Sequence, residues 1–208
     1  MKLTQQTVSE FLAAVRDSRP TPGGGSAAAV AGALGASLLA MVASMPKHRA
    51  ASEEDVERLQ AAAARCRALA ERLEVLVDED SNAYDSVVAA YRLPKSSEQE
   101  KAERKRGIQQ ALHAAIDAPL EVMRHSVDAI EAASTVARFG NPNAASDVGV
   151  ALELLVAAER GARLNVLINL SNVEDSEALE RIGGTVRTLA AECRRGAEAA
   201  GALLDAGA

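Results

Sequence analysis

The chain has 208 residues, with 23 Lys and Arg against 29 Asp and Glu, a formal charge of −6, and 45 Ala but 2 Tyr, 2 Phe and no Trp. A hydrophobic content of 48% with mixed charge excludes global disorder, and an acidic chain with so few aromatic side chains argues against nucleic acid as the main partner. Abundant Ala favours helix over strand, so we predict a single all-α domain over residues 1–208.

The first predicted helix begins at Thr7, which forms a capping-box pattern with Glu10, and ends near Asp17. Its apolar residues recur at helical spacing: Val8, Phe11, Leu12 and Val15. The N-terminus has one Lys but no apolar segment of the kind that secretory signals carry. We therefore expect a cytoplasmic protein.

A stretch without any charged residue runs from Ser26 to Met45, where Pro46 ends it. It is long enough to cross a bilayer. However, it is rich in Ala, Gly and Ser, whereas transfer into lipid gains most from larger apolar side chains. We expect the central helix of a bundle, with small residues that allow close approach of its neighbours, and no membrane partner.

Four more helices are predicted. The third begins at Ser52 and reaches Tyr91, and the fourth begins at the capping box of Ser97 and Glu100 and is kinked or interrupted by Pro119. After a turn cluster at residues 140–147, Ser146 or Asp147 caps a helix to Leu170, and Asp175 or Ser176 caps one to Leu204. About six helices with short loops predict an antiparallel bundle.

No metal site is predicted. The three histidines, His48, His113 and His125, show no metal-ligand spacing, and the sequence contains neither CxxC nor HExxH. Cys66 and Cys193 are too few for a disulfide framework, and we expect both to be reduced, although pairing between the two stays open.

The glycine run Gly23, Gly24 and Gly25, followed by Ser26, leads directly into the uncharged helix. Glycines allow a ligand to approach the backbone, and the free amides of a helix N-terminus favour an anion. The Lys of a phosphate-binding P-loop is absent. The alternative is a tight turn, capped by Ser26, that admits the helix into a crowded core.

Asp80 lies on the apolar stripe of the third helix, four residues after Leu76 and four before Tyr84. A carboxylate there must be partnered or lie in a cleft, and desolvation raises its pKa toward the range useful for proton transfer. The alternative is a structural Asp that hydrogen-bonds the terminus of a neighbouring helix.

Asn165 and Asn169 are spaced i, i+4 on an otherwise apolar helix, so they share one face. Either they bind a polar ligand, or they form hydrogen bonds between helices of the bundle.

Three blocks, at residues 21–42, 78–95 and 141–170, together resemble the cyclodeaminase/cyclohydrolase family. The resemblance covers nearly the whole chain. It implies an all-helical homodimer with a folate site near the glycine run, a tetrahydrofolate derivative as substrate, and no metal or tightly bound cofactor. The chain begins shortly before the first block, without a formimidoyltransferase domain, which favours a free-standing cyclohydrolase.

The activity that we expect is hydrolysis of 5,10-methenyltetrahydrofolate to 10-formyltetrahydrofolate in one-carbon metabolism. Asp80 is the candidate base, and Tyr84 is expected either to orient it or to hydrogen-bond the ligand, while Gly23, Gly24, Gly25 and Ser26 line the folate site. By resemblance, further substrate contacts come from Lys95, Asn141, Asn143, Asp147, Asn165 and Asn169. The alternatives are a formimidoyltetrahydrofolate cyclodeaminase and a non-enzymatic helical scaffold or binding subunit.

Overall fold

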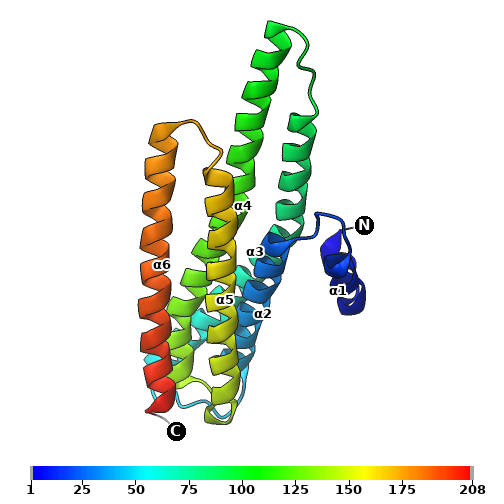
Figure 1. Ribbon diagram of the computed structural model, residues 1–208. Helices are drawn as coiled ribbons and strands as arrows, with labels where there is room; N and C mark the ends of the chain where they lie inside the picture. Colours follow the sequence, from blue (N-terminus) through cyan, green and yellow to red (C-terminus); the bar gives the residue numbers. More distant parts are fainter. Residues whose placement is uncertain (1, 207–208) are drawn as a thin grey trace.

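The computed structural model describes residues 2–206, which form an antiparallel helical bundle without any strand (Figure 1). This confirms the all-α prediction. The elements are η1 (Leu3–Gln5), α1 (Val8–Arg16), α2 (Gly24–Ser44), α3 (Glu53–Tyr91), α4 (Glu98–Phe139), η2 (Pro142–Ala144), α5 (Ala145–Leu170) and α6 (Ser176–Asp205). Helices α3 and α4 form a long hairpin whose tip projects beyond the rest of the molecule, and α1 stands off beside it (Figure 1).

Local capping signals set four helix starts where they were predicted. Thr7 and Ser97 form complete capping boxes with Glu10 and Glu100, and Ser52 accepts a hydrogen bond from the Asp55 N–H. Of the two candidates for α6, it is Asp175 that caps, by accepting from the N–H groups of Glu177 and Ala178.

The predicted start of α5 was wrong. Helix α5 begins at Ala145, directly after the 3-10 turn η2, and neither Ser146 nor Asp147 caps it. The Asn141 side chain accepts a hydrogen bond from the Asn143 N–H, so the Asn-Pro turn initiates this segment in place of a helix cap.

Pro119 does not interrupt α4, which is continuous from Glu98 to Phe139. A proline has no N–H, so the carbonyl four residues earlier, that of Ala115, loses its partner in the helix. The Asn169 side chain of α5 donates to this carbonyl at 3.0 Å. A side chain of α5 thus replaces the hydrogen bond that Pro119 cannot make, and α4 stays continuous.

Helix α2 packs against α3 and α5 along its length, with a further contact to α4. By length and hydropathy it could cross a membrane, but 56% of its apolar window is buried within the bundle. Small residues permit this packing: a Cβ at Gly35 would lie 2.7 Å from Leu155 Cγ and 2.9 Å from the Ala151 carbonyl. The central position expected for this helix is therefore observed.

Ala36→Leu is expected to lower the free energy of unfolding by about 1–3 kcal/mol, because Ala36 is fully buried in α2 and the core has no space for a larger side chain. Ala157→Leu is the matched control, since Ala157 is exposed on α5 and we expect almost no loss. Urea unfolding of both variants measures the difference, and equal losses would contradict this account of α2.

Both cysteines are buried and free, so Cys66 of α3 and Cys193 of α6 do not pair. Burial raises the pKa of the Cys66 thiol to about 11 and that of Cys193 to about 12, the latter also because Glu159 lies beside it. Thiols with such pKa values are protonated at neutral pH.

Glu159 on α5 is only 2% exposed and lies beside the Cys193 thiol. Desolvation raises its pKa above 4.5, although Arg163 and Arg160 act in the opposite direction. A raised folded-state pKa contributes stability below the unfolded value, and this contribution is lost as the pH rises through the folded value.

Glu159→Gln is therefore expected to gain stability relative to wild type as the pH rises above about 4.5, because the amide keeps the acceptor and never ionises. Urea unfolding across this pH range measures the difference. Glu153→Gln, at an exposed position of the same helix, should follow wild type at every pH. A pH-independent difference between Glu159→Gln and wild type would contradict the assignment.

Candidate functional site

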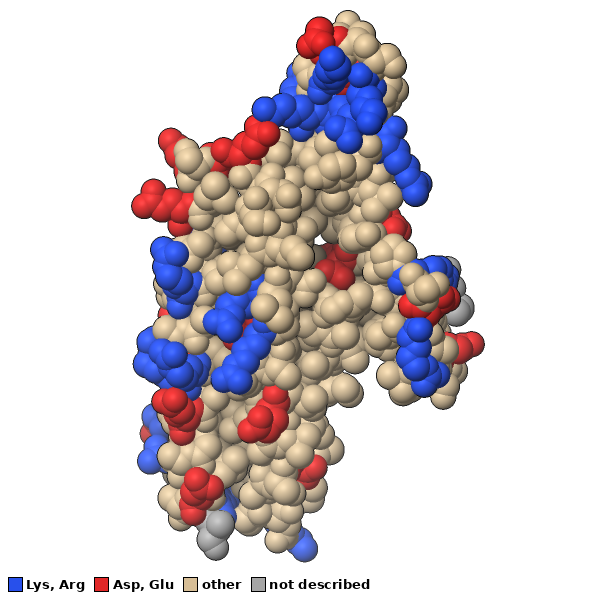
Figure 2. All heavy atoms as spheres, viewed as in Figure 1, with Lys and Arg blue, Asp and Glu red and all other residues tan. Residues whose placement is uncertain are grey.

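The candidate site lies where α2 begins, against the middle of α3. The Asp80 carboxylate accepts a hydrogen bond from the Ser26 hydroxyl, with 3.0 Å between Oγ and Oδ2. Desolvation raises the pKa of Asp80, whereas the Ser26 hydroxyl and main-chain N–H lower it to a smaller extent. On this face of the molecule, acidic atoms lie at the bottom of a hollow beneath the α3–α4 hairpin (Figure 2).

Gly25 makes room for this carboxylate. A Cβ at Gly25 would lie 2.0 Å from Asp80 Oδ1 and 2.7 Å from Oδ2, which is inside any allowed contact distance. The second and third residues of α2 are therefore fitted to Asp80, one by having no side chain and the other by donating to the carboxylate.

The start of α2 has no cap of its own, because its N-cap residue Gly23 offers no side chain. Asp80 of α3 acts as the cap of α2 instead. This agrees with the alternative that Asp80 is a structural residue that hydrogen-bonds the terminus of a neighbouring helix. The same placement suits a proton-transfer group, since a partly desolvated carboxylate at a helix N-terminus can still exchange a proton with a bound molecule. No glycine among residues 2–206 has a positive φ, so what the glycine run provides is the close approach of Asp80 at Gly25.

Asn165 also reaches this site. A Cβ at Gly24 would lie 3.7 Å from Asn165 Nδ2, and this nitrogen donates to the Gly161 carbonyl. Its neighbour Asn169 donates to the carbonyls of Ala115 and Asn165. The inter-helix alternative thus accounts for Asn169, whereas Asn165 lies against the glycine run.

Tyr84 lies one turn after Asp80 on α3 and is 41% exposed, so its ring is accessible to a ligand. Lys95 lies in the exposed connection after α3. Tyr91, at the end of α3, is eleven helical steps from Asp80, which is about 16 Å. Basic side chains cluster near the tip of the α3–α4 hairpin (Figure 2). The roles predicted for Tyr84 and Lys95 stay predictions.

Asn141, Asn143 and Asp147 lie at the other end of the molecule. The Asn141 side chain donates to the Pro46 carbonyl at 2.7 Å, just after α2 ends, whereas Gly25 is where α2 begins. The 21 residues of α2 span about 30 Å. The expectation that these three residues share one site with Asp80 is therefore not met within a single chain.

Asp78 was not among the predicted site residues, yet it holds the N-terminal turn next to the site. Its carboxylate accepts from the Leu3 N–H at 2.6 Å and from the Thr4 hydroxyl at 2.8 Å. Asp78 thus anchors η1 two residues from Asp80. The contact joins residues 75 positions apart, so no local pattern signals it.

No group of three or more His, Cys, Asp or Glu side chains within residues 2–206 is arranged to hold a metal ion.

The fold and the site together define a class: an all-helical bundle that holds a desolvated carboxylate at the glycine-rich N-terminus of its central helix. The family model described as formiminotransferase-cyclodeaminase matches residues 7–188. The chain therefore belongs to the formiminotransferase-cyclodeaminase family.

Individual relatives fall into two groups. The chain is 39% identical to a methenyltetrahydrofolate cyclohydrolase of Methylorubrum extorquens over 82% of each protein. It is 31% identical to the formimidoyltransferase-cyclodeaminase of Gallus gallus over 98% of this chain, which spans only 38% of that protein. The crystal structure of a formiminotetrahydrofolate cyclodeaminase from Thermotoga maritima superposes with a TM-score of 0.87 at 27% identity, covering 99% of this chain and 98% of the other.

Proposed function

We propose that the protein hydrolyses 5,10-methenyltetrahydrofolate to 10-formyltetrahydrofolate. The observation that carries this proposal is the Asp80 carboxylate, which is desolvated, held by Ser26 and packed on Gly25. The 39% identity with a methenyltetrahydrofolate cyclohydrolase over most of both chains supports this reaction over others of the family.

In the proposed reaction, water adds to the amidinium carbon between N5 and N10, and Asp80 accepts the proton that this water loses. The resulting carbinol then collapses: the bond from carbon to N5 breaks, N5 takes up the proton held by Asp80, and the carbinol hydroxyl releases its proton to solvent. This leaves the formyl group on N10, with one proton released overall. The substrate is already an activated cation, so the protein mainly positions water and moves protons. Tyr84 and Asn165 are the nearby groups proposed to orient Asp80 or contact the pterin, and Lys95 to meet the glutamyl carboxylates.

The second candidate is a cyclodeaminase that releases ammonia from formimidoyltetrahydrofolate. The structural match to a formiminotetrahydrofolate cyclodeaminase over 99% of this chain favours it. Both reactions pass through a tetrahedral carbon between the same two nitrogens, so the same carboxylate serves either.

Two parallel assays separate the candidates. We expect purified protein to accelerate the loss of methenyltetrahydrofolate absorbance and to release no ammonia from the formimidoyl compound. Ammonia release without hydrolysis would assign the cyclodeaminase reaction. Inactivity toward both compounds, in a folded protein, would assign a non-enzymatic binding or scaffold role.

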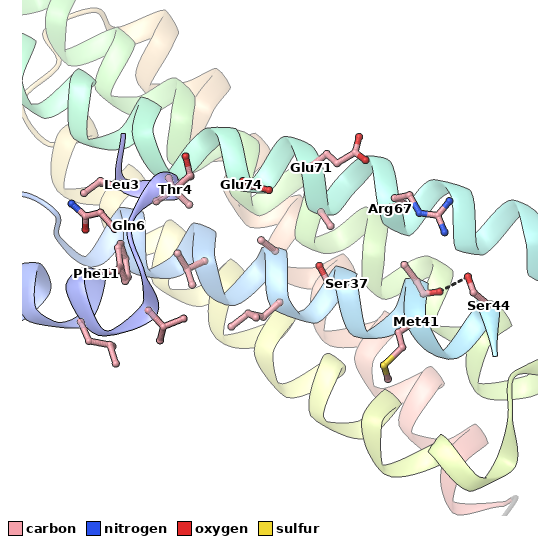
Figure 3. Close-up of a pocket in the computed structure, with 18 residues that line it drawn as sticks. Leu3, Thr4, Gln6, Phe11, Ser37, Met41, Ser44, Arg67, Glu71 and Glu74 are labelled. Atoms are coloured by element: carbon pink, nitrogen blue, oxygen red, sulfur yellow. Dashed lines mark hydrogen bonds between the residues drawn. The ribbon is translucent and has the colours of Figure 1, made fainter. Parts of the chain in front are cut away.

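We also propose that the protein is a homodimer in the cytoplasm, with the dimer interface at a groove of about 780 Å³ between η1, α1, α2 and α3 (Figure 3). Its apolar walls are exposed: Leu34 and Met41 of α2 are 53% and 44% exposed, and Val8 and Leu12 of α1 are 77% and 51% exposed. An apolar surface of this kind marks an interaction site.

The charges along the groove are complementary to those of a second copy of the chain. Along the α3 rim, Arg67 lies nearest Met41 and Ser44, and Glu71 and then Glu74 follow it in the direction of Thr4 (Figure 3). A two-fold axis across the groove places each Arg67 opposite the glutamates of the other copy. Helix α2, which forms the floor of the groove, has no charged residue, so dimer formation would bury no charge there.

Leu34→Glu is expected to convert a dimer into a monomer, because the substitution puts two unpaired carboxylates into the interface. Sedimentation velocity measures the mass. Val150→Glu is the matched control, since Val150 is 52% exposed on α5 and lies outside the groove. A monomeric wild type, an unchanged mass for Leu34→Glu, or recovery of wild type with membranes would contradict this interface.

A further inference from the structure

The Ser26 side chain lies between two acceptors. Its hydroxyl oxygen is 3.1 Å from the Val77 carbonyl and 3.0 Å from Asp80 Oδ2, and the residue is fully buried. A hydroxyl carries one proton, so it donates to only one of these oxygens at a time. Ser26, which was predicted to line the folate site, therefore faces Asp80 and not the ligand.

The two acceptors correspond to the two protonation states of Asp80. When the carboxylate is ionised, donation from Ser26 stabilises its charge. When Asp80 has gained a proton, the hydroxyl can turn to the Val77 carbonyl without leaving any buried donor unpaired. Only the torsion of the hydroxyl changes, and no bond of Ser26 breaks.

We propose that Ser26 is a positioning residue, whose hydroxyl holds Oδ2 of ionised Asp80, leaves Oδ1 to exchange the proton, and turns to Val77 when Asp80 is protonated. The inference rests on the proposed function, in which Asp80 is the base. It assigns Ser26 a role in acid–base chemistry that differs from substrate contact.

The charged side chains nearest Asp80 along α3, and Glu121 on α4, form their contacts with groups other than Asp80. Helix α2 and the turn η1 carry none. On α3, Asp78 binds η1, and Glu79 forms two hydrogen bonds with Arg72. On α4, Glu121 lies beside His125.

The α5 residue nearest the glycine run is the uncharged Asn165. Burial raises the pKa of Asp80, and the Ser26 hydroxyl is the first group that opposes it.

Ser26→Ala is the first test. Removing a hydrogen bond to a charged group is expected to raise the pKa of Asp80 by about 1–2 units. Carboxyl carbon NMR, with the Asp80 signal assigned by its loss in Asp80→Asn, measures this pKa without any substrate. The acidic limb of the kcat/KM profile should move to higher pH by the same amount.

Ser26→Cys keeps the size of the side chain with a weaker donor, so we expect an intermediate shift and a folded protein. Ser126→Ala is the matched control, because Ser126 is equally buried but lies on α4, and its pH profile should equal that of wild type.

An unchanged Asp80 pKa in both Ser26 variants would overturn the proposal. A shifted pKa with an unmoved kcat/KM profile would overturn it as well, because Asp80 would then not be the group that titrates in turnover. A shifted pKa in a protein inactive toward both folates would leave the Ser26–Asp80 coupling intact and refute only the proposed function.

Discussion

Asp80→Asn is expected to lower turnover of methenyltetrahydrofolate by at least about a hundredfold, the scale of losing a general base. The amide oxygen of Asn can still accept the Ser26 hydrogen bond that Asp80 receives at 3.0 Å, so the start of α2 stays in place. What the variant loses is the capacity to take up a proton. Turnover is measured by absorbance and helix content by circular dichroism.

The same variant separates catalysis from capping. The raised pKa of Asp80 means that its stability contribution is lost as the pH rises through that pKa, so Asn should cost no stability at neutral pH. Asp85→Asn, at an exposed position five residues further along α3, is the control and should be fully active. Normal turnover by Asp80→Asn would make this carboxylate purely structural.

Gly25→Ala should have the second large effect, on both activity and stability. The added Cβ would lie 2.0 Å from Asp80 Oδ1, so either the carboxylate or the first turn of α2 must move. We expect turnover to fall by about a hundredfold or more, and the free energy of unfolding to fall by about 1–3 kcal/mol.

Gly24→Ala is its neighbour and control. A Cβ there meets only Asn165 Nδ2, at an ordinary contact distance of 3.7 Å, so stability should be almost unchanged. If a ligand approaches the main chain at this exposed glycine, the Michaelis constant rises while turnover is retained. Equal kinetic effects of the two substitutions would show that Gly25 is not specifically fitted to Asp80.

The positions of most helices follow from local sequence, because caps and apolar spacing act within a few residues. Thr7, Ser52, Ser97 and Asp175 cap where the pattern indicated. The uncharged stretch from Ser26 likewise indicated a central helix, since a helix without a polar face is stable in water only when neighbours cover it. Asp80 stood out for a similar reason, as a carboxylate on an apolar stripe.

Tertiary structure decided the partners of these residues, because each contact joins positions far apart in the chain. Ser26 and Asp80 are 54 residues apart, and so are Ala115 and Asn169, whose hydrogen bond keeps α4 continuous across Pro119. Sequence placed Asn141 and Asn165 in one site, yet they lie near opposite ends of α2. Local pattern thus determined which residues are unusual and on which helix they lie, whereas the packing of α2 against α3 and α5 determined what each one touches.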